Sequence, residues 1–472
     1  MELEAMKKLV KLCQRRHREM IRESKVAERY YRKKNDILRN GARRTGEIGN
    51  PLHNADNRIP SNFYNILVNQ KASYLFASPP IFDTGTPDWN ERIMRILGDD
   101  FARNCKRLCI NASNSAVAWL HYWVDSKGVF KYTVIDSKQI VPVWKGGDLE
   151  KELLGVLRAY DWTDEDGKIL NIYEYWDQER CWAFAKENQR SITTLEIYPF
   201  FSYMSYDVPS DASQTNVLPH TFGEVPFIPF FNNAEGGNDL NDVKELIDTY
   251  DKVYSGYLND LDDIQEVIFI LSGYEGENLR EFLEKLKKYK TVKLERDEDG
   301  KGGLSTLTID IPVEAREKML TMTRKAIFEQ GMGIDPDPQN FGNSSGVALS
   351  YLYSLLELKS GLMETEFRSG FGRLIRAICK YLGEEPETIT QTWTRTSVRN
   401  DTELAAIAQQ STGILSRHSV LANHPWVDDV DKELKRLEKE EREEKEAMET
   451  YAGVFPPNAG GEAGEEGVSE GR

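Results

Sequence analysis

The sequence predicts an α+β protein that is mainly helical, and three observations support this class. Apolar residues recur at helical spacing through most of the chain, most regularly after residue 239. A central region, residues 116–231, instead alternates short apolar and β-branched runs with turns, and it contains six of the nine tryptophans. The composition, 40% hydrophobic and 29% charged, is that of a folded protein. We therefore expect several helices around a strand-rich core.

The first 62 residues are predicted to form a basic helical arm. Residues 1–44 carry fifteen Lys and Arg against six Asp and Glu, whereas the whole chain has a net charge of −16. A solvated, partly disordered helix and a binding surface are equally consistent with such an arm. The chain is charged from Glu2 onward, which argues against a signal peptide and indicates a protein that works inside the cell or in something assembled there.

Two helices are predicted between residues 54 and 111. The segment that starts at Asn54 begins with turn-forming residues and continues as an apolar helix. The pair Pro79–Pro80 is predicted to end this helix. A second helical stretch is predicted over residues 88–111. These helices lead into the strand-rich region, and together they make up a predicted domain of residues 63–235.

The strand-rich region is predicted to be an antiparallel meander with its own core. Runs such as AVAWLHYWVD, VFKYTVID, ILNIYEYW and SITTLEIY are separated by turn signals, of which Asp166–Gly167 is one. Wide aromatic residues at strand positions favour this arrangement.

The clearest pattern in the chain follows the turn-rich segment NNAEGGND, residues 232–239, which is predicted to be a hinge. Apolar residues then fall at alternating steps of three and four, the heptad seam of a helix that packs on other helices. The seam consists of Leu240, Val243, Ile247, Tyr250, Tyr254, Tyr257, Leu261 and Ile264. The predicted helix, of about 25 residues within the segment 236–264, would be roughly 37 Å long.

Residues 265–311 are predicted to form a small mixed α/β unit, with a strand at 267–273, a helix, and two further strands joined by a turn. The helix and the following strand are rich in cations: Arg280, Lys285, Lys287, Lys288, Lys290, Lys293 and Arg296. A solvated helix face and a contact with a partner are equally consistent with these cations. A second long helix, residues 312–332, starts at Pro312 and ends at the glycines Gly331 and Gly333.

The stretch GIDPDPQNFGNSSG, residues 333–346, separates this helix from a third long helix, which runs to about Leu382. The stretch is too rich in turn formers to be helical, and Gly333 and Gly346 are predicted to let it swing. It offers hydrogen-bonding groups and no cations: Asp335, Asp337, Gln339, Asn340, Asn343, Ser344 and Ser345. Three glycines inside the third helix are predicted bend points: Gly361, Gly370 and Gly372.

The C-terminal part is predicted to hold a short return strand near residue 393, helices over residues 399–450, and a disordered tail, 451–472, that includes six glycines. The helices have a helix–turn–helix look around Gly413. Their surroundings are acidic, however, and groove binding needs phosphate-neutralising charge. We therefore interpret them as a structural helical hairpin.

No enzyme signature is present, and no metal or cofactor site is predicted. The chain has neither an H-E-x-x-H motif nor a phosphate-binding G-x-x-x-x-G-K-[ST] loop. The five scattered cysteines are expected to be buried thiols. No apolar run approaches the roughly 18 residues that a membrane span needs. One acidic group would suit a metal-dependent nuclease, although a solvated face explains it better: Asp260, Asp262, Asp263 and Glu266.

Four phrases, in this order, resemble the portal proteins of long-tailed bacteriophages that infect Gram-positive hosts. They are NADNRIPSNFYNILVNQKASYLFASPP (54–80), NDLNDVKELIDTYDKVYSGYLNDLDDI (238–264), FGNSSGVALSYLYSLLELK (341–359) and GILSRHSVLANHPWVDDVDKELKRLEKE (413–440). Each alone could be an ordinary helix, but together they span nearly the whole chain.

The resemblance implies a structural subunit of a homo-oligomeric ring, usually of twelve copies, at one vertex of the capsid. Residues 63–235 and 347–398 would be the wing, 236–264 and 312–332 the stem helices, 265–311 the clip, and 399–450 the crown. The loop 333–346 would protrude into the channel and touch double-stranded DNA in transit. An acidic channel wall suits such a duct, because tight phosphate pairing would stall the DNA.

The implied partners are the terminase large subunit, a head–tail adaptor, and the major capsid and scaffolding proteins, with no membrane contact. The implied location is the virion, after assembly in the host bacterial cytoplasm. The seam agrees with a ring, since a ring supplies neighbouring helices on both sides. The alternative is a coiled-coil scaffold, which would explain the seam but not the tryptophan-rich strands.

Overall fold

The structure is a computed structural model of the chain, and it combines helices with antiparallel strands, which confirms the predicted mixture of α and β. It describes residues 1–39, 55–125, 127–146, 152–163, 166–198, 216–264, 268–272, 303–307, 312–337, 346–395, 401–422, 424, 426–427 and 430–454. The chain divides into two compact units. The first comprises Met1–Asn340 and Leu352–Ser397, and the second comprises Phe341–Tyr351 and Val398–Arg472.

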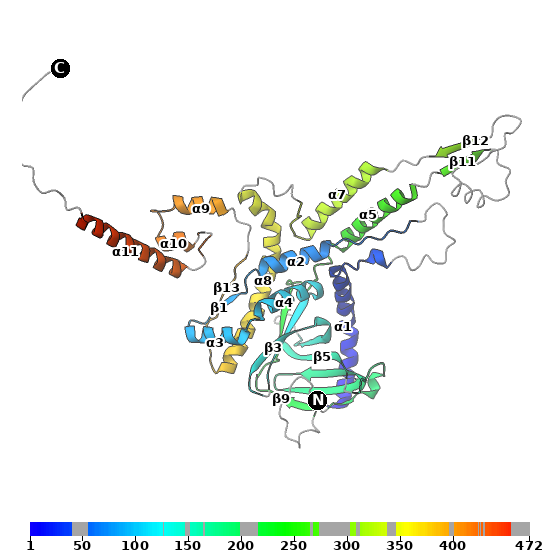
Figure 1. The fold of residues 1–472 in the computed structure, drawn as a ribbon. Coiled ribbons are helices and arrows are strands. Elements are labelled where there is room, and N and C mark those ends of the chain that lie inside the picture. The colour runs from blue at the N-terminus through cyan, green and yellow to red at the C-terminus, as the bar shows by residue number, and fades with distance from the viewer. Residues whose placement is uncertain are drawn as a thin grey trace, which may run out of the picture. The chain divides into compact units, whose positions relative to one another are not determined.

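Helix α1 (Leu3–Tyr31) is an integral part of the first unit and not a solvated arm. Met6, Val10 and Cys13 share one face of this helix and are buried in a core that they form with strands β5, β6 and β7. Near the other end of the helix, Tyr30 enters a second core. Figure 1 shows α1, in dark blue, running along the edge of the sheet region. The charge of this segment therefore belongs to the outer face of a core helix. A short 3₁₀ turn, η1 (Asp36–Leu38), follows it.

The apolar segment after residue 54 forms α2 (Phe63–Leu75), as its pattern predicts. The stretch predicted to be helical over 88–111 is two helices, α3 (Pro87–Leu97) and α4 (Phe101–Ser115). The break falls at Gly98, whose φ of 64° lies in the left-handed region that glycine adopts without strain. A continuous helix was the wrong prediction here because the apolar spacing continues across the break.

Two antiparallel sheets occupy the tryptophan-rich region. The smaller has the order β10–β2–β3, and the larger has the order β4–β5–β6–β7–β8 with β9 also paired to β7. The smaller sheet consists of β2 (Val117–Val124), β3 (Phe130–Ile135) and β10 (Phe227–Phe231). The larger consists of β4 (Ile140–Trp144), β5 (Leu153–Thr163), β6 (Ile169–Trp176), β7 (Arg180–Glu187), β8 (Glu196–Ile197) and β9 (Val217–Pro219). The 3₁₀ turn η2 (Ser137–Gln139) links the two sheets.

The run SITTLEIY was predicted to be a strand, but it begins with the 3₁₀ turn η3 (Ile192–Thr194) and contributes only the short β8. The cause is local. The Ser191 side chain accepts a hydrogen bond from the backbone nitrogen of Thr193 and so favours a turn over an extended chain.

Aromatic residues fill the cores on both faces of the smaller sheet. Trp119, Trp176 and Phe227 are buried between the two sheets. On the other face, Phe230 of β10 packs against helices that include α8, and it meets Phe367 with ring centroids 5.1 Å apart. The tryptophans of this region thus supply the large apolar surface that two facing layers need.

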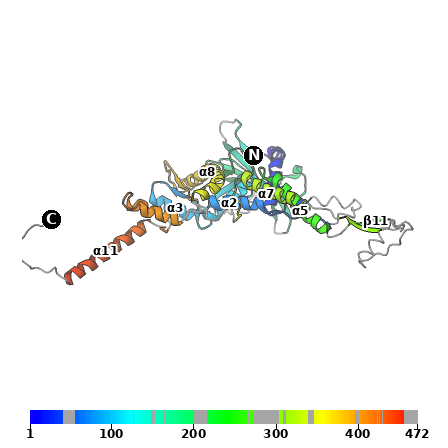
Figure 2. The same ribbon diagram turned by 90° about the horizontal axis from the view of Figure 1, so that it is seen from above.

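Helices α5 (Lys244–Ile264) and α7 (Val313–Gln330) lie side by side, as Figures 1 and 2 both show. The helix predicted to start at Leu240 starts four residues later, because residues 240–243 form a turn. Between α5 and α7 in sequence, β11 (Ile268–Ser272) pairs antiparallel with β12 (Gly303–Leu307). The remainder of 265–311, including the predicted helix, lies outside the described residues.

The third long helix is α8 (Gly346–Leu382), with the bounds that the sequence predicts. After it, β13 (Thr390–Thr392) pairs with β1 (Ile81–Asp83), so a late segment of the first unit pairs with an early one. The predicted bend glycine Gly370 has a different function in this fold. A Cβ atom there would lie 2.5 Å from the ring of Phe230, so glycine allows α8 to approach the sheet.

The described helices that lie wholly in the second unit are α9 (Asp401–Gln410), α10 (Arg417–Ala422) and α11 (Val430–Val454). Arg417 of α10 forms an ion pair with Glu441 of α11. The tail beyond residue 454 lies outside the described residues. Within the described part of the chain, no helix combines the length and the hydrophobicity that a membrane crossing requires.

Candidate functional site

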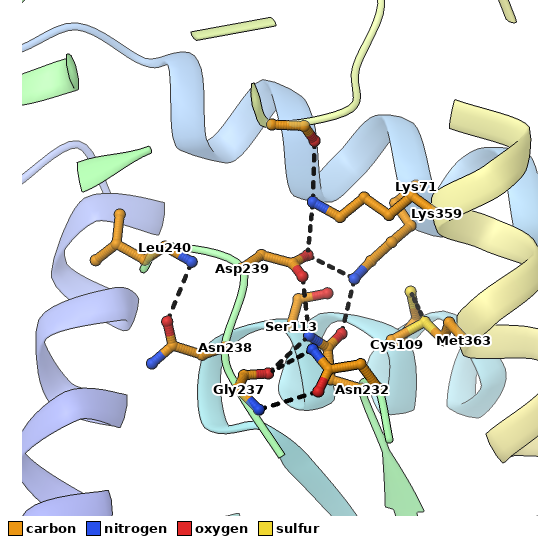
Figure 3. Close-up of polar contacts among 12 residues, drawn as sticks. Lys71, Cys109, Ser113, Asn232, Gly237, Asn238, Asp239, Leu240, Lys359 and Met363 are labelled. Atoms are coloured by element: carbon orange, nitrogen blue, oxygen red, sulfur yellow. Dashed lines mark hydrogen bonds and ion pairs between the residues drawn. The ribbon is translucent and has the colours of Figure 1, made fainter. Parts of the chain in front are cut away.

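Four polar side chains meet in the interior where α2, α8 and the segment before α5 converge, and we call them the buried hub: Lys71, Asn232, Asp239 and Lys359. The Lys71 ammonium lies 2.5 Å from an oxygen of Asp239 and donates a hydrogen bond of 2.8 Å to Asn232. Lys359 approaches the same Asp239 oxygen at 3.5 Å. Figure 3 shows both lysines pointing at Asp239 from different helices. Lys71 is 1% exposed and Asp239 is 5% exposed.

The turn-rich segment 232–239 holds the carboxylate of the hub in place. The Asn232 amide donates to the Gly237 carbonyl at 3.0 Å and to the second Asp239 oxygen at 2.8 Å. The Asn238 side chain accepts from the backbone nitrogen of Leu240 at 3.1 Å and so starts the turn that leads into α5. The predicted hinge is therefore a hydrogen-bonded turn at the base of α5.

Opposing effects set the ionisation of the hub. Burial alone would raise the pKa of Asp239, but the charges of Lys359 and Lys71, with hydrogen bonds from Lys71 and Asn232, lower that pKa well below its usual range. Burial lowers the pKa of Lys359, and the Asp239 charge opposes that shift. The Asp239 carboxylate thus compensates the charges of two ammonium groups, those of Lys71 and Lys359. Its second oxygen accepts the hydrogen bond from Asn232.

The end of α7 is tied to this hub. Lys359 donates a hydrogen bond of 3.0 Å to the carbonyl of Gly331. Met332 takes a left-handed φ of 52°, and the backbone nitrogens of Met332 and Gly333 bond back to Glu329 and Phe328, at 3.2 and 2.9 Å. This is a Schellman ending with methionine in the position that usually holds glycine.

The glycines beside Met332 have a packing function. A Cβ atom at Gly331 would lie 2.6 Å from a methyl group of Leu67 on α2, and one at Gly333 would lie 2.2 Å from the other methyl group. The Gln70 amide clamps the next residue, since it donates to the Ile334 carbonyl at 2.7 Å and accepts from the Ile334 nitrogen at 3.0 Å. Gly333 is therefore part of a tight anchor and not the swinging pivot that the sequence suggested.

The anchor continues to Asp335. Arg324 of α7 meets this carboxylate with two nitrogens, at 3.0 and 2.6 Å, in a bidentate ion pair. The pairing with Asp335 is the main effect that raises the pKa of Arg324. Asp337 donates its backbone nitrogen to Asp335 at 3.3 Å. Of the other residues predicted for this loop, Gln339, Asn340, Asn343, Ser344 and Ser345 lie outside the described residues.

The predicted seam divides into two parts. Leu240, Val243 and Ile247 are buried in the first unit's own core, so they cannot form the contact between copies that was predicted for them. Tyr254 and Leu261 are each 41% exposed. Tyr250 and Tyr257 are half-buried, and the side chain of Ile264 lies outside the described residues.

Two acidic residues near the end of α5 already have partners within the chain, whereas the Asp263 side chain and Glu266 lie outside the described residues. Asp260 pairs with Arg316 of α7, and Asp262 accepts from the Asn57 amide at 2.6 Å. Across the described part of the chain, no three His, Cys, Asp or Glu side chains gather as metal ligands would. The predicted cationic residues of the 265–311 unit, from Arg280 to Arg296, lie outside the described residues.

Sequence reasoning missed Lys71 and Lys359, although a signal for both was present. Each lysine falls at a core position by helical spacing, between Val68 and Leu75 on α2, and between Leu356 and Met363 on α8. A charged residue in an otherwise apolar helix stripe indicates a buried partner. The partner could not be predicted, because it comes from a distant segment.

The buried hub lies just before α5 and the anchor lies at the end of α7, so both long helices are tied to α2. The family model described as phage portal protein, SPP1 Gp6-like, matches residues 10–447. The chain belongs to this family, which confirms the resemblance found in the sequence.

Two relatives support this assignment. A portal protein of Clostridium phage phiCD119 is 42% identical over 92% of this chain and 95% of its own length. The portal protein of Bacillus phage SPP1 is 27% identical over 86% of this chain and 81% of its own length. Solved structures with similarity include the neck of a native GTA particle with C12 symmetry. It is 12% identical, with a TM-score of 0.39, over 77% of this chain and 89% of that chain.

Proposed function

We propose that this portal protein assembles into a ring, of about twelve copies by family resemblance, that forms the DNA channel at one capsid vertex. DNA would enter through it during packaging and leave through it during ejection. The chain would have no catalytic activity of its own, so a partner ATPase must supply the energy. Its place would be the virion, after assembly in the host cytoplasm.

The observation that supports assembly is a set of exposed apolar residues on the long helices of the first unit. They are Tyr254 and Leu261 on α5, Met319 and Met322 on α7, and Leu358 and Leu362 on α8. On α8, Leu358 and Leu362 are four residues apart and so share one face. Exposed apolar side chains at helical spacing favour contact with another protein surface, and a ring offers a second copy.

The test replaces two of these residues with charged ones. In the variant Leu358→Glu/Leu362→Glu, contact with a second copy would bury two carboxylates without partners, which is costly. We expect a folded monomer by light scattering and circular dichroism, where the unchanged protein gives rings in electron micrographs. The control variant, Met94→Glu/Ile169→Glu, changes residues of similar exposure on α3 and β6 and should still form rings. Rings from the first variant would contradict the proposal.

The loop 333–346 is proposed to contact DNA in transit. Because residues 333–335 are anchored to α2 and α7, the contact with DNA would come from the later residues, with their amide and hydroxyl groups. Asp335 would hold the loop in place through Arg324, and repulsion of phosphates would come from Asp337. Uncharged hydrogen bonders suit a sliding contact, since tight phosphate pairing would slow the DNA.

The 265–311 unit is proposed to dock the terminase motor and later the head–tail adaptor. The support is the segment 280–296, in which seven Lys and Arg residues, including Lys287 and Lys288, outnumber three Glu residues. Cations at an exposed rim accelerate association with an acidic partner. Major capsid and scaffolding proteins would contact the ring elsewhere during assembly.

A further inference from the structure

A row of cations follows the outer face of α1, and we call it the α1 row: Lys8, Lys11, Arg15, Arg18, Arg22 and Lys25. Successive members are three or four residues apart, so they lie on one face of the helix. All six are exposed. From Lys8 to Lys25 the row is about 26 Å long.

The core fixes the direction in which this row points. Met6, Val10 and Cys13 are buried against the larger sheet, and at 100° per residue they lie on the side of α1 opposite the row. Further along, Ala27 and Tyr30 are buried in the next core. The helix therefore cannot rotate to hide the cations, and the row faces away from the first unit.

Folding gives no reason for such a row. Like charges three or four residues apart repel each other and destabilise a helix. Among the described residues, Arg22 has an ion-pair partner, Glu19 at 3.6 Å, with both side chains exposed. The other five members form no ion pair with any described residue. An outer face selected only for solubility usually mixes the two signs of charge.

We propose that the α1 row docks an acidic helix of a partner protein. The row follows one face of the helix along its axis. It therefore matches carboxylates at the same three- and four-residue steps along another helix, each of which would meet one cation. This inference is independent of the proposed channel function.

Duplex DNA fits this surface less well than a helix does. Its phosphates follow two curved strands, which leave a straight row after a few contacts. Glu19 and Glu23 are exposed along one edge of the row, where they would repel phosphates on that side. A single partner helix is narrow enough to avoid them.

The test uses the full chain and two synthetic alanine-based peptides of equal composition. In the first peptide, glutamates follow three- and four-residue steps along one face. In the second, the same number of glutamates is distributed around the helix. Fluorescence anisotropy at low ionic strength should show about tenfold tighter binding of the first peptide, and this binding should weaken as salt is added.

Two variants locate the contact. Lys11→Glu/Arg15→Glu/Arg18→Glu should abolish binding of the first peptide. Arg103→Glu/Lys106→Glu/Arg107→Glu makes the same charge change on exposed cations of α4 and should keep the binding. Circular dichroism and melting temperature check that both variants fold.

Several results would overturn the inference. One is equal binding of the two peptides, and another is equal loss of binding in the two variants. A third is no binding of either peptide. A short duplex DNA or anionic lipid vesicles could also bind more tightly than the first peptide. If that binding depended on the α1 row, the row would be a site for DNA or lipid and not for an acidic helix.

Discussion

Lys71 and Lys359 show how much depends on one buried carboxylate in this molecule, that of Asp239. They come from helices almost 300 positions apart in the chain, and both rely on Asp239. A buried ion pair adds little net stability compared with apolar packing, but removal of one member leaves a buried charge without a partner. The three charged members of the hub should therefore differ in their sensitivity to mutation.

We predict that Asp239→Asn is more destabilising than Lys71→Met. The first change leaves the buried Lys71 and the half-buried Lys359 without the Asp239 carboxylate, and we expect a loss of about 3–5 kcal/mol in the free energy of unfolding. The second leaves Asp239 with Lys359 and should cost less. Urea unfolding followed by circular dichroism gives both values. Glu91→Gln, which removes an exposed pair with Arg95, is the control and should cost less than about 1 kcal/mol. An equal or larger loss in Lys71→Met would contradict this assignment.

His121 makes the sheet region sensitive to acid. It stacks on Phe227 with centroids 4.2 Å apart, and its Nδ1 lies 2.8 Å from the Pro226 carbonyl oxygen. Burial lowers its pKa to about 3, with smaller contributions from the charges of Arg158 and His220. The unfolded chain, with a histidine pKa near about 6.5, binds the proton first. His121 thus contributes stability that is complete above about pH 6.5 and is lost as the pH falls toward 3.

We predict that His121→Phe flattens this dependence. The variant should be less stable than the unchanged protein at pH 7, because the Pro226 carbonyl loses one of its two donors and keeps only the backbone nitrogen of Tyr122. Between about pH 6.5 and 4, however, its free energy of unfolding should fall less steeply, by up to about 1.4 kcal/mol per pH unit. Two other histidines keep part of the slope, since partial or complete burial also lowers the pKa of His17 and His220. The exposed His418→Phe variant should retain the full slope, and an unchanged slope in His121→Phe would reject the prediction.

At the scale of elements, the sequence predicts the long helices better than the connections between them. The bounds of α8 and of α7 follow from their apolar spacing, from Pro312 and from the turn formers that flank them. The break between α3 and α4 was missed, since one glycine interrupts a pattern that otherwise continues. The packing of α1 was also missed, because its charge outweighed its apolar stripe in the interpretation.

Glycines inside α8 provide a test at this scale. A methyl group at Gly370 would meet Phe230 ring atoms at 2.5 to 3.0 Å, whereas one at Gly372 would have its nearest contact at 3.5 Å, with Gln391. We predict that Gly370→Ala lowers the free energy of unfolding by about 1–3 kcal/mol through overpacking. Gly372→Ala should raise it by up to about 1 kcal/mol, because alanine favours the helix. Thermal unfolding of the pair gives the comparison, and equal effects would show that Phe230 does not limit this approach.

At the scale of the whole molecule, the heptad seam shows that one sequence cannot distinguish burial within the chain from burial against a second copy. Both halves of the seam have the same spacing, so the pattern predicts burial for both but not the surface that buries each. In the structure, Leu240, Val243 and Ile247 pack on α1, α2 and α7 of the same chain. The anchor at Gln70 and Ile334 could not be predicted for a related reason. It joins segments 264 residues apart through hydrogen bonds between the Gln70 side chain and the backbone of Ile334, and the residue type at position 334 does not specify a backbone partner.

This division of the seam predicts different outcomes for two single substitutions on the same helix. Ile247→Asp places a charge in a core where the side chain is 1% exposed, so we expect a misfolded or aggregated chain. Leu261→Asp alters a side chain that is 41% exposed, so the monomer should keep its circular dichroism spectrum and melting temperature. If the outer part of α5 contacts a second copy, this folded monomer should fail to form rings in light scattering and electron micrographs. The exposed, more distant Ile169→Asp is the control and should assemble. Normal rings from Leu261→Asp would restrict the contact between copies to α7 and α8. A well-folded Ile247→Asp variant would contradict the core position of Ile247.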